Sequence, residues 1–158
     1  MMWNWKMVFD DDACAFYCDV DQIVDTVGDA EGTYPSTECY MPTPDRFGVW
    51  TSLSFKDKEI VKRYVAERKR MGLRIKGYEG YQYSLCLVEF DSRKMKYRII
   101  PAMDYNAKDD QIGDSFLFGD GAFSLIDGLS GEWAGIRSRK THPMIKALHK
   151  MFSSSVEC

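Results

Sequence analysis

The sequence has few of the residues from which catalytic and metal sites are built. Its 158 residues include two histidines and five cysteines, and no two cysteines form a C-x-x-C pair. A Cys/His zinc site is therefore not expected, and we predict neither a metal nor any other cofactor. The glycine-rich stretch from Gly128 to Gly135 lacks the endings of a phosphate-binding loop, and no G-x-S-x-G is present. These absences predict that the protein is not an enzyme.

Long apolar runs are also missing. No run approaches the ~18 residues that a transmembrane helix needs, so we predict no transmembrane segment. The first residues, Met1 to Lys6, lack the charged and apolar regions of a signal peptide, although a chain whose leader had been removed would look the same. The expected location is the cytoplasm if Met1 is the native start. It is the cell envelope or the exterior if a leader was removed.

What the sequence does contain is typical of one globular domain. Hydrophobic residues make up 45%, charged residues 28% and aromatic residues 14% of the chain, and the aromatic content favours strands. The length is near that of a single domain, so residues 1–158 are expected to form one domain.

Alternating and β-rich runs predict most of the sheet. Residues 3–9 and 14–20 indicate a hairpin with an acidic turn, and residues 47–53 a further strand. Residues 81–90 and 94–105 are the strongest strand pair and are expected at the centre of the sheet. Residues 28–44 are expected to form an irregular loop, and residues 106–132 one or two more strands between turns.

Two helices are predicted. The first covers about residues 57–71, with Ser54 as a candidate cap and Gly72 at the C-terminal end. The second follows Thr141-His142-Pro143 and places Ile145, Leu148, Met151 and Phe152 on one face. The expected fold class is α+β: a mainly antiparallel sheet of about six strands, with the C-terminal helix packed on one face and an additional basic helix at about 57–71.

Charge is distributed unevenly along the chain. Residues 1–55 hold ten acidic and two basic side chains, whereas residues 56–76 hold nine basic and three acidic ones. The basic helix is therefore a candidate site for an anionic partner. The acidic isoelectric point of 5.4 argues against specific nucleic-acid binding, and the helix could instead rest against the acidic region, within the chain or across a homodimer. The candidate binding residues are Lys62, Arg63, Arg68, Lys69, Arg70 and Arg74.

Other polar features have simpler interpretations. Asp10, Asp11 and Asp12 lack the spacing of a calcium loop and are expected to be turn residues. Cys14 and Cys18 are too far apart on one strand to bond each other, and they are expected to be core residues. Neither His142 nor His149 lies in a motif with a serine or cysteine nucleophile.

A series of short landmarks follows one order along the chain: Trp5, Phe16 to Ile23, Val49-Trp50, Leu87 to Asp91, Lys96 to Arg98, Asp104-Tyr105, Trp133, Ile136 and Cys158. In this series the chain resembles the bacterial surface-adhesin protein E family. The resemblance implies an antiparallel sheet with a C-terminal helix on its concave face, export to the cell envelope, frequent dimerisation and no enzymatic activity.

Two departures from the family pattern affect these expectations. The family's cysteine after Phe-Asp is Ser92 here, although Cys158 resembles its usual partner, and a relocated Cys86–Cys158 bridge is one alternative. The basic helix and residues 106–132 look like additions. The resulting hypothesis is a non-enzymatic surface-binding module that contacts a protein or an anionic polysaccharide. The alternative is a cytosolic ligand-sensing or regulatory domain.

Overall fold

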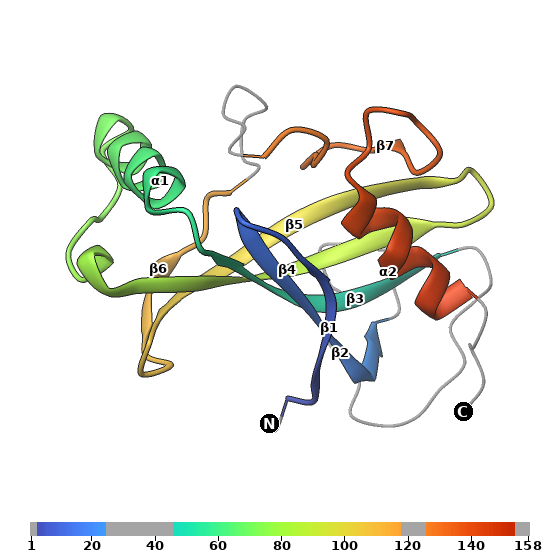
Figure 1. Cartoon of the computed structure of the whole chain (residues 1–158), viewed down its shortest axis with the longest axis horizontal. Helices are drawn as coiled ribbons and strands as arrows, with labels where there is room; N and C mark the ends of the chain where they lie inside the picture. The colour runs from blue at the N-terminus through green and yellow to red at the C-terminus, as the bar shows by residue number, and fades with distance from the viewer. Residues whose placement is uncertain (1–2, 25–45, 118–125, 154–158) are drawn as a thin grey trace.

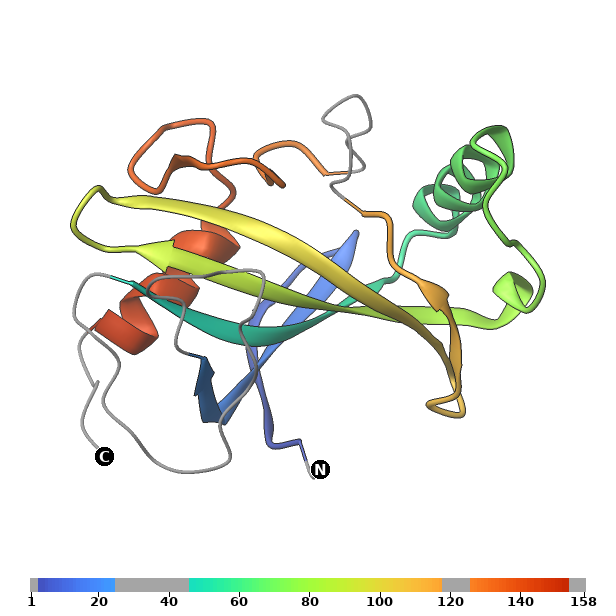
Figure 2. The ribbon, with the colours of Figure 1, turned by 180° about the vertical axis from the view of Figure 1, so that it is seen from behind.

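The computed structural model describes residues 3–24, 46–117 and 126–153, and these form an antiparallel sheet with two helices (Figures 1 and 2). The sheet has seven strands, six of which follow one another in the order β1-β2-β3-β4-β5-β6. The α+β prediction, with about six strands, is confirmed. The strands are β1 Trp5–Asp10, β2 Cys14–Val24, β3 Arg46–Phe55, β4 Tyr81–Asp91, β5 Lys96–Asn106, β6 Gln111–Asp114 and β7 Ala134–Gly135.

The predicted N-terminal hairpin consists of β1 and β2. Asp11 shapes its turn, because one carboxylate oxygen accepts hydrogen bonds from the N–H groups of Ala13 and Cys14 at 2.8 and 2.9 Å. Cys14 and Cys18 lie on β2 as buried free thiols, which confirms them as core residues. Burial raises the pKa of the Cys18 thiol to about 11.

The second predicted hairpin, β4 and β5, lies inside the sheet. β3 pairs with β4 on the side away from β5. Alternation along β4 separates two faces: Ser84, Cys86, Val88 and Phe90 point to one, and Tyr83, Leu85, Leu87 and Glu89 point to the other. The first of these faces meets both helices, and we call it the helix face.

The outer edge of β5 is shared between two short strands. β6 pairs with residues 103–105 of β5, and β7 pairs with residues 96–97. Between them, the Ile99 N–H donates to the Ser130 carbonyl at 2.9 Å and the Ser115 N–H donates to the Ala102 carbonyl at 3.2 Å. Pro101, which has no N–H to offer, lies in the same stretch.

The C-terminal helix, α2, covers Pro143–Ser153 and packs on the helix face through apolar side chains. The predicted stripe is confirmed for Ile145, Leu148 and Phe152, which are buried together with Met144. The ring nitrogen Nδ1 of His142 accepts a hydrogen bond from the Met144 N–H at 3.1 Å. His142 therefore caps this helix.

The basic helix, α1, covers Lys58–Arg70, close to the predicted range, and the short 3-10 helix η1 covers Tyr78–Gly80. Figure 1 places α1 and α2 at opposite ends of the sheet. Ser54 belongs to β3, so the prediction that it caps α1 is wrong. Among the described residues, neither helix is long and apolar enough to cross a membrane. The predicted loop at 28–44 lies outside the described residues.

Candidate binding surface on the basic helix

Both ends of α1 are fixed by local hydrogen bonds. At the start, the Asp57 carboxylate accepts from the Glu59 N–H at 2.9 Å, so Asp57 is the N-cap. At the end, Gly72 adopts a φ of 73°, and the N–H groups of Gly72 and Leu73 donate to the carbonyls of Lys69 and Arg68 at 3.1 and 2.9 Å. This pair of bonds is a Schellman motif, which glycine allows because it tolerates positive φ.

The inner face of α1 is attached to the sheet by a buried polar cluster centred on Asp104 of β5. Asp104 is 0% exposed, and one carboxylate oxygen accepts hydrogen bonds from the hydroxyls of Tyr64 and Tyr78 at 2.6 and 2.7 Å. The Ser84 hydroxyl donates to the other oxygen at 2.5 Å. We call Asp104, Ser84, Tyr64, Tyr78 and Arg68 the Asp104 cluster.

Arg68 is the cation of this cluster, and its side chain is 3% exposed. Its guanidinium lies 3.6 Å from Asp104 and donates to the carbonyls of Asp114 and Arg74 at 2.7 and 2.9 Å. It also lies over the Tyr78 ring, 4.2 Å from the ring centre. Arg68 therefore bonds to buried groups of the protein itself. Contrary to the prediction, it is not an exposed binding residue.

The electrostatics of the cluster follow from its burial. Burial raises the pKa of Asp104, against the hydrogen bonds from Ser84, Tyr64 and Tyr78 and the charge of Arg68, which lower it. Burial and the neighbouring Asp104 carboxylate also raise the pKa of Tyr64 and Tyr78, so both phenols stay protonated donors at neutral pH. Two of the four partners of the Asp104 carboxylate, Tyr64 and Arg68, lie on α1 and fix the helix to the sheet.

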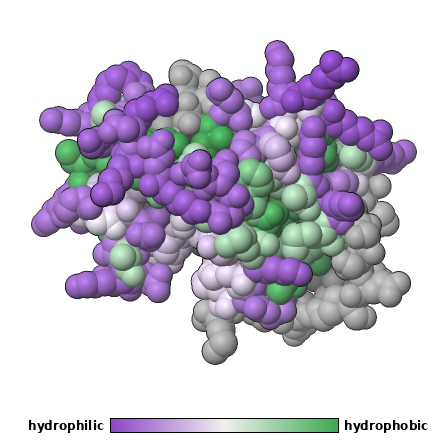
Figure 3. All heavy atoms as spheres, viewed as in Figure 1, coloured by the Kyte–Doolittle hydropathy of each residue, from purple (hydrophilic) through white to green (hydrophobic). Residues whose placement is uncertain are grey.

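The remaining five candidate residues are solvent-exposed: Lys62, Arg63, Lys69, Arg70 and Arg74. Figure 3 shows mostly hydrophilic side chains over this end of the molecule. Two of the cations pair within the helix, Lys62 with Glu59 at 3.3 Å and Arg70 with Glu67. Exposed pairs of this kind are weak, so they leave most of the positive field available.

Apolar side chains are exposed immediately after the helix. Met71, Leu73 and Ile75 are 39%, 38% and 38% exposed, and they alternate with the basic residues Arg70, Arg74 and Lys76. Exposed large apolar side chains that stand together are typical of interaction sites. We call the five exposed cations and these three apolar residues the basic surface.

A cavity of about 610 Å³ lies beside the basic surface. Its lining joins Arg68, Leu73 and Arg74 to the middle of β5 and to the β6 segment. Its remaining lining residues are Pro101, Gln111, Ile112, Gly113, Asp114, Ser115 and Phe116. The cavity is large enough for a small ligand or for a side chain of a partner.

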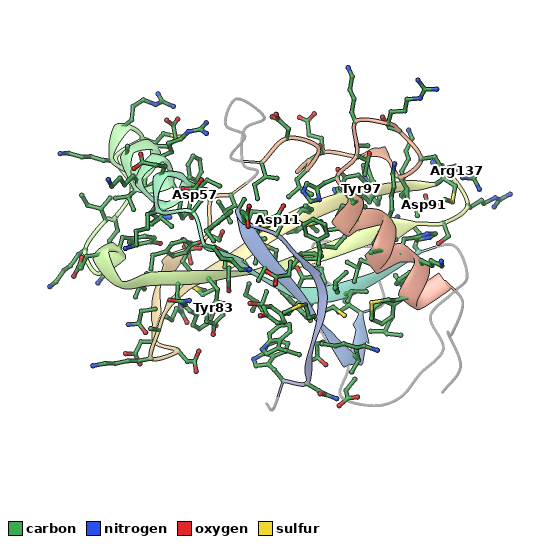
Figure 4. All side chains as sticks on the ribbon, viewed as in Figure 1. Asp11, Asp57, Tyr83, Asp91, Tyr97 and Arg137 are labelled. Carbon is green, nitrogen blue, oxygen red and sulfur yellow. The ribbon has the colours of Figure 1, made fainter. Side chains whose placement is uncertain are left out.

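The acidic turn meets the opposite end of α1. The Lys56 N–H donates to the Ala13 carbonyl at 2.8 Å, and the Lys56 ammonium pairs with Asp10. This contact puts the turn beside the N-cap, as the labels of Asp11 and Asp57 in Figure 4 show. A contact between the basic segment 56–76 and the acidic region is thus seen at Lys56, which lies before α1. The acidic residues of 25–45 lie outside the described part.

A contact that the sequence did not indicate joins α2 to the turn after β4. The Ser92 hydroxyl and Nε2 of His149 are 3.0 Å apart. Burial, together with the charge of Arg137, lowers the pKa of His149. Within residues 3–24, 46–117 and 126–153, no carboxylate bonds the other ring nitrogen of His149.

The cysteine predictions are tested only in part. Cys86 is a buried free thiol on β4. Cys158 lies outside the described residues, so its pairing stays a prediction. No group of three metal-ligating side chains is found in the part of the chain that the structure describes.

Comparisons with known proteins give no relative. No family model, no curated protein and no solved structure matches this chain. The resemblance to surface-adhesin protein E therefore stays a proposal.

The basic helix was predicted from the sequence, but the prediction did not distinguish its buried cation from its exposed ones. Arg68 follows Tyr64 by four residues and Ile60 by eight, and all three lie on the buried face. That spacing is the one available signal, because residues four apart share a helix face. The partner of Arg68, Asp104, is 36 residues away in sequence, and no local sequence pattern indicates that the two residues meet.

Proposed function

We propose that this chain is a non-enzymatic binding module that contacts an acidic macromolecule, a protein or an anionic polysaccharide, through the basic surface. The observation that carries the proposal is the exposure of five cations and three apolar side chains on α1 and on the segment that follows it, with α1 fixed to the sheet by the Asp104 cluster. A preformed helix loses little conformational freedom on binding, and clustered cations accelerate encounter with an anionic partner.

A surface-adhesin protein E-like role in the cell envelope belongs to the same proposal. Ser92 stands where that family has a cysteine, and its hydrogen bond to His149 joins the sheet to α2 at this position. A helix that the family ties to the sheet by a covalent bond would here be attached by a hydrogen bond and apolar packing. The contact therefore lies where the resemblance would place the family's covalent bond.

The test is retention on a heparin column, with heparin as a model anionic polysaccharide. We expect the triple substitution Lys69→Glu, Arg70→Glu and Arg74→Glu to elute at a clearly lower salt concentration than the unchanged protein. Arg68 is left unchanged because it is buried. The matched control reverses three exposed lysines elsewhere: Lys94, Lys108 and Lys146.

Both triple variants change the net charge equally, so the comparison isolates position. Equal elution of the two variants would show that net charge alone governs retention and would refute the basic surface as the site. Failure of the unchanged protein to bind heparin would remove anionic polysaccharide from the proposal. The proposal would then rest on an acidic protein partner. Such a partner should be captured by the unchanged protein but not by the basic-surface variant.

The second candidate is a ligand-sensing or regulatory domain of the cytosol. The cavity beside Arg68 and Arg74 favours it, because a small anionic ligand would meet the exposed guanidinium of Arg74 there. Counting thiols in the denatured, unreduced protein separates the two candidates. Five reactive thiols support the cytosolic role, whereas a protected pair that includes Cys158 supports export.

A further inference from the structure

A second hollow lies on the opposite side of the sheet from the helices. Tyr83 and Leu85 of β4 point to that side, and Figure 4 shows Tyr83 on the side of the sheet away from α1. Trp3 and Trp5, at the start of the described chain, lie at the same hollow. Figure 3 shows the notch between the N-terminal segment and the turn that joins β5 to β6.

The hollow is a cavity of about 210 Å³ with an aromatic lining. Trp3 and Trp5 stack with ring centres 5.0 Å apart and planes inclined by 14°. Tyr83 and Tyr105 stack in the same way, at 5.0 Å and 11°. Two stacked pairs from separate parts of the chain therefore line one small space, which we call the aromatic pocket; Leu85 and Asp109 complete its lining.

One carboxylate enters this lining. The Tyr83 hydroxyl donates to Oδ1 of Asp109 at 2.9 Å. Asp109 is held in place by its own backbone, with a φ of 62° and an N–H that donates to the Asn106 carbonyl at 3.0 Å. The carboxylate is thus positioned at the edge of the pocket, and none of the six lining residues is basic.

The charge distribution of the pocket selects for a cation. The faces of aromatic rings carry negative charge density and attract ammonium groups, and alkylated ammonium groups are typical ligands of sites lined by several aromatic rings. Asp109 adds a full negative charge on one side. A cavity of about 210 Å³ is smaller than the ~300–1,000 Å³ of pockets for drug-sized ligands, so a head group or one side chain fits it.

We propose that the aromatic pocket binds a small alkylated ammonium group, a quaternary ammonium head group of the choline type. The rings contact the alkyl groups, and Asp109 balances the charge. This site is separate from the basic surface and recognises the opposite charge. Its test is therefore independent of the heparin experiment.

The experiment compares two probes of the same shape. Choline carries a quaternary nitrogen, and 3,3-dimethylbutan-1-ol has a neutral carbon in its place. Binding to the intact chain is followed by tryptophan fluorescence, since Trp3 and Trp5 line the pocket, and by calorimetry. We expect choline to bind about tenfold more tightly than the neutral alcohol, because only choline gains the cation–π and carboxylate attractions.

Two variants locate the site. Asp109→Asn removes the pocket charge without changing shape, and Tyr105→Leu removes one ring, so each is expected to weaken choline binding about fivefold to tenfold. Asp110→Asn is the matched control, since it makes the same charge change on an exposed neighbour outside the lining.

Three results would overturn the proposal. Equal affinity for choline and the neutral alcohol would show that the pocket is merely apolar. Tighter binding of a methyl glycoside would identify a sugar-stacking site instead. Equal weakening by Asp109→Asn and Asp110→Asn would place the effect outside the pocket.

Discussion

The two helices lie on the same face of the sheet, but different interactions fix them there. α1 is attached by the Asp104 cluster, in which one buried carboxylate meets three hydroxyls and a guanidinium. α2 is attached by Met144, Ile145, Leu148 and Phe152, which are buried and apolar. Hydrogen bonds fix direction and distance, whereas apolar packing tolerates small shifts. The helix that leads into the basic surface is therefore held by the more directional of the two attachments.

The strongest test of this comparison removes the charge from the polar attachment. Asp104→Asn keeps the shape but leaves Arg68 without its anion and turns one acceptor into a donor. Because breaking a buried ion pair costs about 3 to 5 kcal/mol, we expect a loss of about 4 kcal/mol in the free energy of unfolding. Urea denaturation measures the loss, and hydrogen exchange should show residues 58–70 opening first.

Asp114→Asn is the control for this variant, because the Asp114 side chain is exposed and only its carbonyl meets Arg68. Its stability should stay within about 0.5 kcal/mol of the unchanged protein. Equal losses in the two variants would contradict the role of Asp104 as the anchor of α1.

The apolar attachment is tested by Leu148→Ala. Leu148 is 0% exposed, and truncating a buried leucine costs about 2 to 5 kcal/mol, so a loss of about 3 kcal/mol is expected in urea denaturation. Hydrogen exchange should increase in residues 143–153, while residues 58–70 keep their protection. Lys146→Ala, an exposed change on the same helix, is the control. If both helices lost protection together, the two attachments would not be independent.

The smallest expected effect concerns pH and the cap of α2. Burial lowers the pKa of His142 below its ordinary value of 6.5, against the charge of Asp11, which raises it. The unfolded chain therefore binds the proton more readily, and stability falls as the pH falls from about 6.5 through the folded pKa. Protonation also removes the acceptor for the Met144 N–H, and the loss of such a cap costs about 1 kcal/mol.

His142→Asn separates the two contributions, because asparagine caps a helix without titrating in this range. We expect its stability to match the unchanged protein at pH 8 and to fall less steeply toward pH 5, as measured by urea denaturation across this range. In the His149→Asn variant, the part of the pH dependence of stability that His142 supplies should remain. An unchanged slope in the His142→Asn variant would show that His142 does not contribute.

The same comparison explains how far the sequence could predict this molecule. The α2 attachment was readable because its apolar residues recur at helical spacing, and Ile145, Leu148 and Phe152 are buried as expected. The hairpins were readable because their strands are close in sequence. The Asp104 cluster could not be predicted, since it joins α1, η1, β4 and β5 through polar residues of the kinds usually found on a protein surface. The Ser92–His149 contact spans 57 residues and was missed for the same reason.

The divided outer edge of β5 bears on how this protein avoids aggregation. An open strand edge can pair with a second chain, and β6, β7 and two loop hydrogen bonds together occupy that edge of β5. Within the described ranges, β1 is then the long strand that ends the sheet on the other side. Its ladder is interrupted by a bulge between Met7 and Phe9, and Lys6 is exposed there. Both features discourage uncontrolled strand addition at β1.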